Sequence, residues 1–278
     1  MSSSVIPMTH SILKVFNFPD FKIIPINNIL QCNGFHFFIY HILNFMIEVP
    51  NSELNVDTDS TIRIGICVQV KQRLIALYSS VDAVLIGGGS GLSSAAGYNH
   101  YHWLPYMEEC LQDFKEWYGL KSPFDGFYYC YSSPEQQWAY YARYIQSMWD
   151  APTGQPYYDL RDIVAEKEVF VLTTNIDMQF ERIFQKERIC DYQGNSGYLQ
   201  CSQPCHDQIY SNVEMIRRMN ENIRELRVPS VLLPRCNECG RIMVPWVRDD
   251  TFLEGKDWRE SVRRYENFLK KYLISGFG

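Results

Sequence analysis

The chain has 278 residues, of which 46% are hydrophobic and 21% are charged, and its formal net charge at pH 7 is −6. This length suits one large domain or a domain with a smaller insert, and the composition is that of a globular protein. The net negative charge argues against nucleic acid as a partner, because neutralising phosphates requires a basic face and no basic cluster is present.

Residues 1–60 differ from the rest and are expected to form an atypical N-terminal extension. Residues 35–49 are strongly apolar, but they include His36, His41 and Glu48, and the stretch is shorter than the ~20 residues of a membrane-spanning helix. The region also lacks the basic leader and small-residue cleavage site of a secretory signal. We therefore expect a packed or disordered extension and no membrane partner.

From residue 61 the sequence has an α/β pattern. Apolar spacing predicts a helix over residues 66–79 and a buried strand over residues 82–86, followed by the loop "GGGSGLSS" and a short helix. Glycines between a strand and a helix let the backbone approach a phosphate closely. However, the G-x-G-x-x-G spacing is not met, and Glu108 and Glu109, at the distance of a ribose-binding carboxylate, fall in a helical pattern. On the loop alone, phosphate binding and an ordinary glycine turn are equal alternatives.

Aromatic side chains are dense over residues 98–150, where we expect most of them to pack core helices and a minority to line a ligand cleft. The stretch "EVFVLTTNID" at residues 168–177 predicts a second buried strand. Its carboxyl end carries the polar residues Thr173, Thr174, Asn175 and Asp177. Polar residues at the carboxyl end of a parallel strand lie where doubly wound sheets bind ligands. Asp177 is equally suited to cap a helix over residues 178–184.

The nine cysteines form two groups. Five are scattered among apolar neighbours, which together with the odd total predicts a reducing, cytoplasmic compartment. The other four form a CxxxC pair and a CxxC pair with thirty residues between them: Cys201, Cys205, Cys236 and Cys239. Four thiolates in two short turns are typical of a tetrahedral, structural zinc site. The sequence thus predicts a zinc-held module with a helix over residues 212–226, followed by an amphipathic helix over residues 257–273.

The glycine loop, the "TTNID" strand end and the four cysteines, in this order, resemble the sirtuin family over about residues 68–273. The family loop GAGxS is matched by "GSGLS" at residues 89–93, and the family TQNID carries Thr174 in place of glutamine. The proline, aspartate, phenylalanine, arginine stretch of sirtuin deacylases is replaced by "YNHY" after Gly97. Where these deacylases have a catalytic His-Gly, this chain has Gln193 and Gly194. The pattern is similar to macrodomain-linked microbial sirtuins, which implies ADP-ribosyl transfer.

The exchange of histidine for Gln193 is the most informative departure. Histidine can take a proton from a ribose hydroxyl, whereas glutamine hydrogen-bonds but cannot act as a base. The resemblance therefore implies a protein ADP-ribosyltransferase that consumes NAD, with two alternatives left open. One is an NAD-dependent deacylase, and the other is a truncated, inactive zinc module.

The resemblance also implies a Rossmann-like parallel sheet with a small inserted zinc-binding module. The NAD-binding part is expected over residues 61–190, the zinc module over residues 191–246, and a return helix over residues 247–278, with the final strands of the sheet missing. The implied acceptor is a protein, in particular a lipoyl-bearing carrier related to the glycine cleavage H protein, and the implied partner is a macrodomain hydrolase that removes the ADP-ribose.

The implied site residues fall into three sets. Asn175 and Gln193 are the catalytic candidates, and the four paired cysteines are the zinc ligands. The candidates for binding NAD are Gly87, Gly88, Gly89, Ser90, Gly91, Ser93, Thr174, Asn175 and Asp177.

Overall fold

A computed structural model of the chain describes residues 72, 75–76 and 78–273. The chain divides into two units, Met1–Arg63 and Ile64–Gly278, and everything that follows concerns the second. The extension expected over residues 1–60 and most of the helix expected over residues 66–79 lie outside the described residues.

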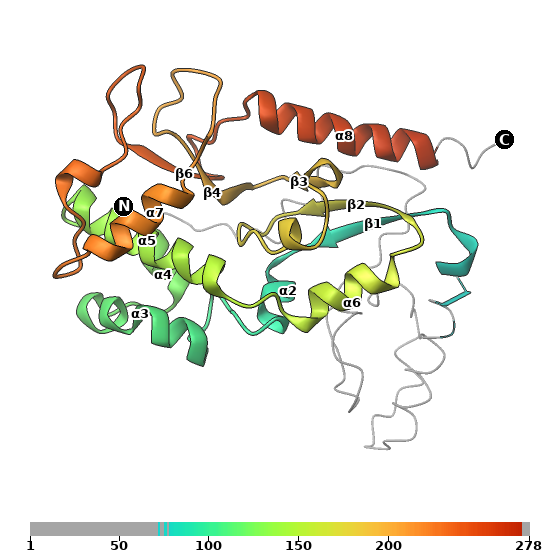
Figure 1. Cartoon of the computed structure of the whole chain (residues 1–278), viewed down its shortest axis with the longest axis horizontal. Helices are drawn as coiled ribbons and strands as arrows, with labels where there is room; N and C mark the ends of the chain where they lie inside the picture. The colour runs from blue at the N-terminus through green and yellow to red at the C-terminus, as the bar shows by residue number, and fades with distance from the viewer. Residues whose placement is uncertain (1–71, 73–74, 77, 274–278) are drawn as a thin grey trace, which may run out of the picture. The chain divides into compact units, whose positions relative to one another are not determined.

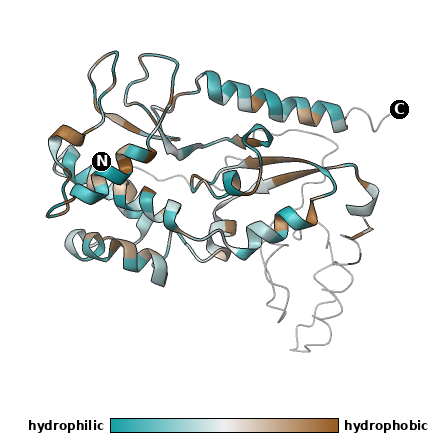
Figure 2. Cartoon of the chain, in the orientation of Figure 1, coloured by the Kyte–Doolittle hydropathy of each residue, from teal (hydrophilic) through white to brown (hydrophobic). Residues whose placement is uncertain are grey.

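A parallel sheet with the strand order β1-β2-β3 forms one part of the unit (Figure 1). Its strands are β1 (Ala83–Gly88), β2 (Glu168–Thr173) and β3 (Ile189–Asp191). Strands β1 and β2 are among the most hydrophobic segments in Figure 2, and Val169, Phe170 and Val171 are buried. Gly88 pairs with Thr173, and Thr173 pairs with Asp191, so the carboxyl ends of the three strands lie along one edge.

Helices α6 (Gln155–Ile163) and α8 (Lys256–Leu273) lie on opposite sides of this sheet in Figure 1. Helix α8 packs on β2 and β3, and the rings of Tyr265 and Phe268 contact Phe170 with centroids 6.0 and 5.6 Å apart. Its other faces are largely hydrophilic in Figure 2, as the amphipathic pattern predicts. Alternating strands and helices around a parallel sheet confirm the predicted α/β class.

A cluster of helices forms a second part. Helices α3 (Pro105–Tyr118), α4 (Pro123–Phe127) and α7 (Val213–Asn222) all pack against α5 (Pro134–Asp150). Helices α3, α4 and α5 each begin with proline, which lacks the N–H that a first helical turn leaves unpaired. The packing of α7 on α5 joins the predicted zinc module to the predicted NAD-binding part, and Asn220 Nδ2 donates to the carbonyl of Ala142 at 2.8 Å.

Many of the aromatic residues between 98 and 150 pack in the core, and others are exposed. Phe114, Trp138, Tyr140 and Tyr144 are at most 1% exposed, which confirms that many of these rings build the core. Trp117, by contrast, is 75% exposed, because it lies on the outer face of α3.

A second, antiparallel sheet has the strand order β5-β4-β6. Its strands are β4 (Gly194–Cys201), β5 (Tyr210–Ser211) and β6 (Met243–Val247). Between β2 and β3, the helix expected over residues 178–184 is reduced to the 3₁₀ turn Phe180–Arg182, and Met178 has a φ of 61°. A residue with positive φ cannot continue a right-handed helix, which explains the difference.

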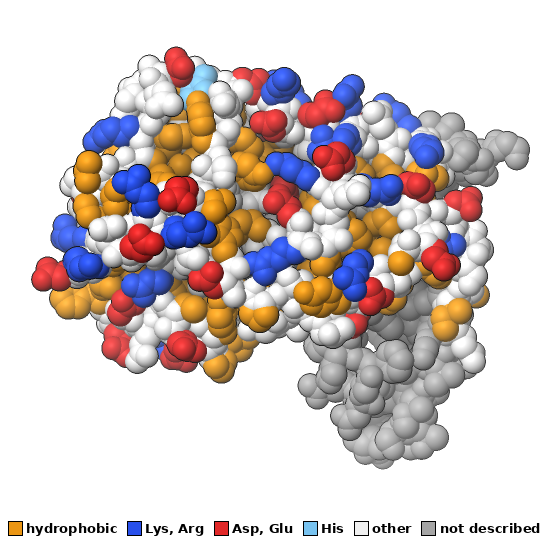
Figure 3. Space-filling view, viewed as in Figure 1, with side chains coloured by type: hydrophobic (Ala, Val, Ile, Leu, Met, Phe, Trp, Pro, Cys, Tyr) orange, Lys and Arg blue, Asp and Glu red, His pale blue; other side chains and the backbone are white. Residues whose placement is uncertain are grey.

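The surface of the described unit mixes both signs of charge. On the face shown in Figure 3, Lys and Arg side chains alternate with Asp and Glu side chains and with hydrophobic ones. Among the described residues, no helix is both long and apolar enough to cross a bilayer.

Candidate functional site

The glycine loop lies at the carboxyl end of β1, as predicted. Gly88 ends the strand, Gly89 is extended with φ −137° and ψ 177°, and α2 (Ser90–Ala95) begins directly after it. A Cβ on Gly88 would lie 2.3 Å from Cε2 of Phe180, so only glycine fits there. A Cβ on Gly87 or Gly91 would meet nothing within 4 Å, which leaves open space beside the loop. The loop therefore combines close backbone packing on one side with room for a ligand on the other.

Asp177 is buried near the carboxyl ends of the parallel strands, beyond the end of β2. Its side chain is 1% exposed, and its Oδ2 accepts hydrogen bonds from Ser93 Oγ at 2.5 Å and from Tyr157 OH at 3.3 Å. Its Oδ1 accepts from the backbone N–H of Gln179 at 3.2 Å. A buried carboxylate is costly unless hydrogen bonds replace its water. These donors, drawn from three elements, hold the carboxylate in one orientation.

Ser93 is one of the residues that the resemblance assigns to NAD binding. It is 0% exposed, and its hydroxyl donates to Asp177. Ser93 thus links the glycine loop to the end of β2. Tyr157 on α6 completes this link, and burial, followed by the charge of Asp177, raises its pKa well above the ordinary value of tyrosine.

Asn175 lies beside Asp177 and is 7% exposed. Its backbone N–H donates to Thr173 Oγ1 at 3.0 Å, while the hydroxyls of Thr173 and Thr174 donate to the carbonyl of Gly88 at 3.3 and 3.4 Å. Its side-chain Nδ2 is buried and has no hydrogen-bond partner of regular geometry among the described residues, although an interaction with Asn175 slightly opposes the raised pKa of Tyr157. Buried polar groups are nearly always hydrogen-bonded, so an orphaned donor at a strand end is suited to a ligand.

Gln193 lies in the short connection between β3 and β4, close to the same edge of the parallel sheet. Its carbonyl accepts from the backbone N–H of Arg248 at 3.0 Å, and its side chain is partly exposed. The next residue, Gly194, has a φ of 83°, and a Cβ there would lie 2.1 Å from the carbonyl oxygen of Trp246. Backbone contacts on both residues therefore fix the position from which the Gln193 side chain extends.

Asp191 and Glu181 form a carboxyl pair near this edge that the sequence did not single out. Asn195 Nδ2 donates to Glu181 Oε1 at 2.8 Å and to Asp191 Oδ2 at 3.4 Å. Burial, and then the negative charge of Glu181, raises the pKa of Asp191 to about 7. In the sequence, only the position of Asp191 two residues before Gln193 could have indicated that it lies near the site. The sequence also did not single out Tyr157, because nothing in the sequence around it indicates its hydrogen bond to Asp177.

The four paired cysteines converge at the far end of β4. Their Sγ atoms all lie within 4.8 Å of one another, and none of the four is in a disulfide. Tetrahedral zinc with Zn–S bonds of ~2.3 Å would separate its sulfurs by about 3.8 Å, so the donor set fits this metal. The turn that carries Cys236 and Cys239 is closed by the N–H of Gly240, which donates to the carbonyl of Cys236 at 2.8 Å. The predicted cysteine cluster is confirmed, and its chemistry is that of a closed, structural zinc site.

Two curated proteins are similar to this chain over about 70% of its length. A protein ADP-ribosyltransferase from Staphylococcus aureus (strain Mu50) is 30% identical over 195 residues, which cover 69% of this chain and 61% of that protein. A probable bifunctional ADP-ribose hydrolase/ADP-ribosyltransferase from Fusarium oxysporum f. sp. cubense is 28% identical over 212 residues, which cover 70% of this chain and 34% of that protein. The chain thus spans less than two thirds of the length of either relative.

The comparison with solved structures gives sirtuins at low overall similarity. A Sir2 homologue in complex with NAD is 15% identical with a TM-score of 0.43, covering 72% of this chain and 68% of that one. Sir2Tm bound to a propionylated peptide is 18% identical with a TM-score of 0.42, covering 69% and 70% of the two chains. No protein-family model matches the chain. The names of the two curated relatives both include ADP-ribosyltransferase, which is the activity that the motifs of this chain imply.

Proposed function

We propose that this chain, a relative of protein ADP-ribosyltransferases, is an NAD-dependent enzyme of the sirtuin type that transfers ADP-ribose to a protein. In this reaction the bond between the nicotinamide nitrogen and the ribose C1′ breaks, and nicotinamide leaves. A nucleophilic atom of the acceptor forms the new bond to C1′ and gives up its proton. Residues 61–190 would bind NAD, and residues 191–246 would supply the zinc-held module.

The buried, unpaired Nδ2 of Asn175 is the observation that carries this proposal. It lies two residues from the Asp177 carboxylate and beside the glycine loop, at the carboxyl edge of the parallel sheet, where ligands of such sheets bind. An amide donor suits the carboxamide or ribose oxygens of NAD. A fixed carboxylate favours the positive charge that develops on the ribose as nicotinamide leaves.

The glycine loop would hold the pyrophosphate, with the open space at Gly87 and Gly91 leaving room for it. Gln193 would position the ribose or the acceptor nucleophile through hydrogen bonds. Because nicotinamide is a good leaving group, positioning and electrostatic stabilisation are sufficient for transfer without a strong base.

For the acceptor, we propose a lipoyl-bearing carrier protein related to the glycine cleavage H protein, as the sirtuin resemblance implies. A macrodomain hydrolase would remove the ADP-ribose. The name of the fungal relative, which joins an ADP-ribose hydrolase to a transferase, supports this pairing of activities. The free cysteines support a reducing, cytoplasmic setting.

The decisive experiment follows labelled NAD into protein. The chain is incubated with labelled NAD and with a lipoylated carrier, an unlipoylated carrier, or an acylated peptide. We expect label on the lipoylated carrier, release of nicotinamide and no deacylated peptide. Asn175→Ala should lower transfer at least a hundredfold, because it removes the buried side-chain donor assigned to the carboxamide or ribose oxygens of NAD. Asn222→Ala on the exposed end of α7 is the matched control and should leave transfer unchanged.

Two results would replace this proposal with another function. Deacylation of the peptide with no label on protein would identify an NAD-dependent deacylase. Absence of heat in calorimetry with millimolar NAD, together with no transfer, would identify a zinc-containing module without enzyme activity.

A further inference from the structure

His206, which follows Cys205 directly, lies against the cysteine cluster. Its Nδ1 is 3.2 Å from Cys205 Sγ and 3.7 Å from Cys236 Sγ. The four thiolates already complete the coordination of a tetrahedral zinc ion, so the imidazole is an additional polar group at this centre. It contacts one sulfur from each of the two cysteine pairs.

Tyr210 contacts the other nitrogen of this imidazole and fixes the orientation of the ring. Tyr210 OH lies 2.9 Å from His206 Nε2, and the two rings are tilted by 64° with centroids 5.7 Å apart. A phenol that donates to Nε2 leaves the hydrogen of the neutral ring on Nδ1, the nitrogen that faces the sulfurs. Tyr210 belongs to β5, so the second sheet holds the histidine in place.

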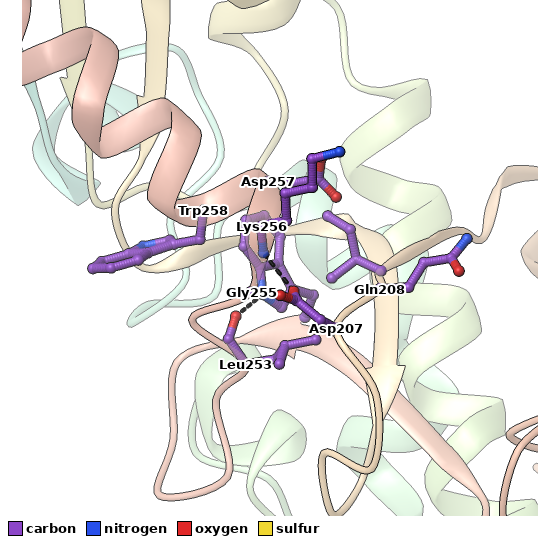
Figure 4. Close-up of a pocket in the computed structure, with 9 residues that line it drawn as sticks. Asp207, Gln208, Leu253, Gly255, Lys256, Asp257 and Trp258 are labelled. Carbon is purple, nitrogen blue, oxygen red and sulfur yellow. Dashed lines mark hydrogen bonds between the residues drawn. The ribbon is translucent and has the colours of Figure 1, made fainter.

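The backbone on the other side of His206 is fixed as well. Asp207 accepts from the backbone N–H of Lys256 at 2.5 Å and pairs with Arg259 at 2.6 Å, which ties it to the first turn of α8. Figure 4 shows the Asp207 carboxylate facing the backbone of Lys256, beside Gly255. His206 is therefore held between a metal-binding thiol and a helix start.

We propose that His206 is a positioning residue of the zinc centre, which donates its Nδ1–H to the Cys205 thiolate without binding the metal itself. Four thiolates leave a bound zinc ion with a net charge of −2, and a hydrogen bond to one sulfur offsets part of that charge. Cys205 and Cys239 are exposed to solvent, whereas Cys201 and Cys236 are buried. The hydrogen bond thus protects one of the two thiolates that water and competing chelators can reach.

Zinc release from the purified full chain tests this role without reference to catalysis. The chain is mixed with a zinc-binding dye, and the rate of metal transfer is measured for the unaltered chain, His206→Phe and Tyr210→Phe. The control is His102→Phe, which changes an exposed histidine that is distant from His206 in the sequence. We expect release about tenfold faster in His206→Phe, the low end of what loss of an outer-shell partner costs a metal site. Tyr210→Phe should show a smaller increase, and His102→Phe none.

Cobalt substitution separates positioning from coordination. In the unaltered chain and in His206→Phe, the sulfur-to-cobalt charge-transfer band should have the intensity of four thiolates. A spectrum of three sulfurs and one nitrogen in the unaltered chain would overturn the proposal, because His206 would then be a ligand. Unchanged zinc release in both His206→Phe and Tyr210→Phe would also overturn it. If His206→Phe does not fold, the release rate of Tyr210→Phe decides: a faster rate supports the proposal and an unchanged rate refutes it.

Discussion

At the scale of single residues, the site depends on how Asp177 is held. Ser93 from α2, Tyr157 from α6 and the backbone of Gln179 all donate to its carboxylate. When one of these donors is removed, the remaining two keep the carboxylate in the site but fix the position of its charge less firmly. Changes at these donors should therefore affect the transition state more than the binding of NAD.

Tyr157→Phe tests this expectation by removing only the hydroxyl. We expect turnover to fall about tenfold, which corresponds to about 1.4 kcal/mol of transition-state stabilisation, while the KM for NAD stays within about twofold. The matched control is Tyr158→Phe, because Tyr158 is exposed and stacks with Arg161 on the same helix. Steady-state transfer assays provide both constants. A rise in KM with unchanged turnover would assign Tyr157 to substrate binding instead.

Asp191 gives a second residue-scale prediction, on stability and pH. Its pKa is raised to about 7 in the folded chain by burial and then by Glu181, with Asn195 and Lys186 opposing and Asp177 adding to the increase. An unfolded aspartic acid titrates near ~3.9. The folded state thus binds more protons between about pH 4 and pH 7, and this contribution to stability is lost as the pH rises through that window.

Denaturant unfolding at pH 5 and pH 8 measures the effect. The unaltered chain should lose stability between pH 5 and pH 8, whereas Asp191→Asn should not lose this part, because an amide has no charge to bury. The free energy of unfolding of Asp191→Asn should therefore rise relative to that of the unaltered chain by up to a few kcal/mol over this range. Asp250→Asn, at an exposed position, should show no such gain. An equal pH dependence in the unaltered chain and Asp191→Asn would contradict this account.

At the scale of elements, the β1–α2 turn has two different requirements for glycine. Gly88→Ala places a Cβ 2.3 Å from Phe180, and we expect a loss of about 1–3 kcal/mol in the free energy of unfolding from overpacking. Gly91→Ala meets nothing within 4 Å inside α2 and should leave stability equal or slightly higher. Under the proposed function, Gly91→Ala should still weaken NAD binding, because the methyl group enters the space assigned to the pyrophosphate. Thermal unfolding and calorimetry with NAD measure the two effects separately.

The sequence predicted those elements whose signals are local. The strand that ends at Gly88, the helix after it, the polar end of β2 and each of the two cysteine pairs depend on spacing within a few residues, and the structure contains all of them. Interactions between distant residues were not predictable. Ser93 and Asp177 are 84 positions apart, and Asn220 and Ala142 are 78 apart, so no periodicity connects them. The turn after Asp177 was also missed, because the positive φ of Met178 comes from tertiary packing and not from a turn residue.

At the scale of the whole described unit, the zinc centre is expected to stabilise one sheet more than the other. Cys201 ends β4, and Cys236 and Cys239 precede β6, so the metal joins the two longest strands of the second sheet. The parallel sheet has no cysteine in this cluster. Loss of the metal should therefore loosen the second sheet first.

Cys236→Ser tests this order of unfolding. Hydrogen exchange should become at least tenfold faster at the amides of β4 and β6, with a smaller change in β1 and β2, and the zinc content should fall from about one ion per chain. Cys130→Ser changes an exposed cysteine outside the cluster and should alter neither. Equal acceleration in both sheets would show that the unit unfolds as one cooperative body.

Strand β4 begins directly after Gln193 and ends at Cys201, so one strand of about 23 Å connects the catalytic candidate to the first metal ligand. Two binding events that order the same strand share a coupling free energy, and that energy is reciprocal. Whatever zinc adds to the affinity for a ligand at Gln193, the ligand must add to the affinity for zinc. The affinity of the chain for zinc, measured at equilibrium, is thus also a measure of whether a ligand is bound at Gln193.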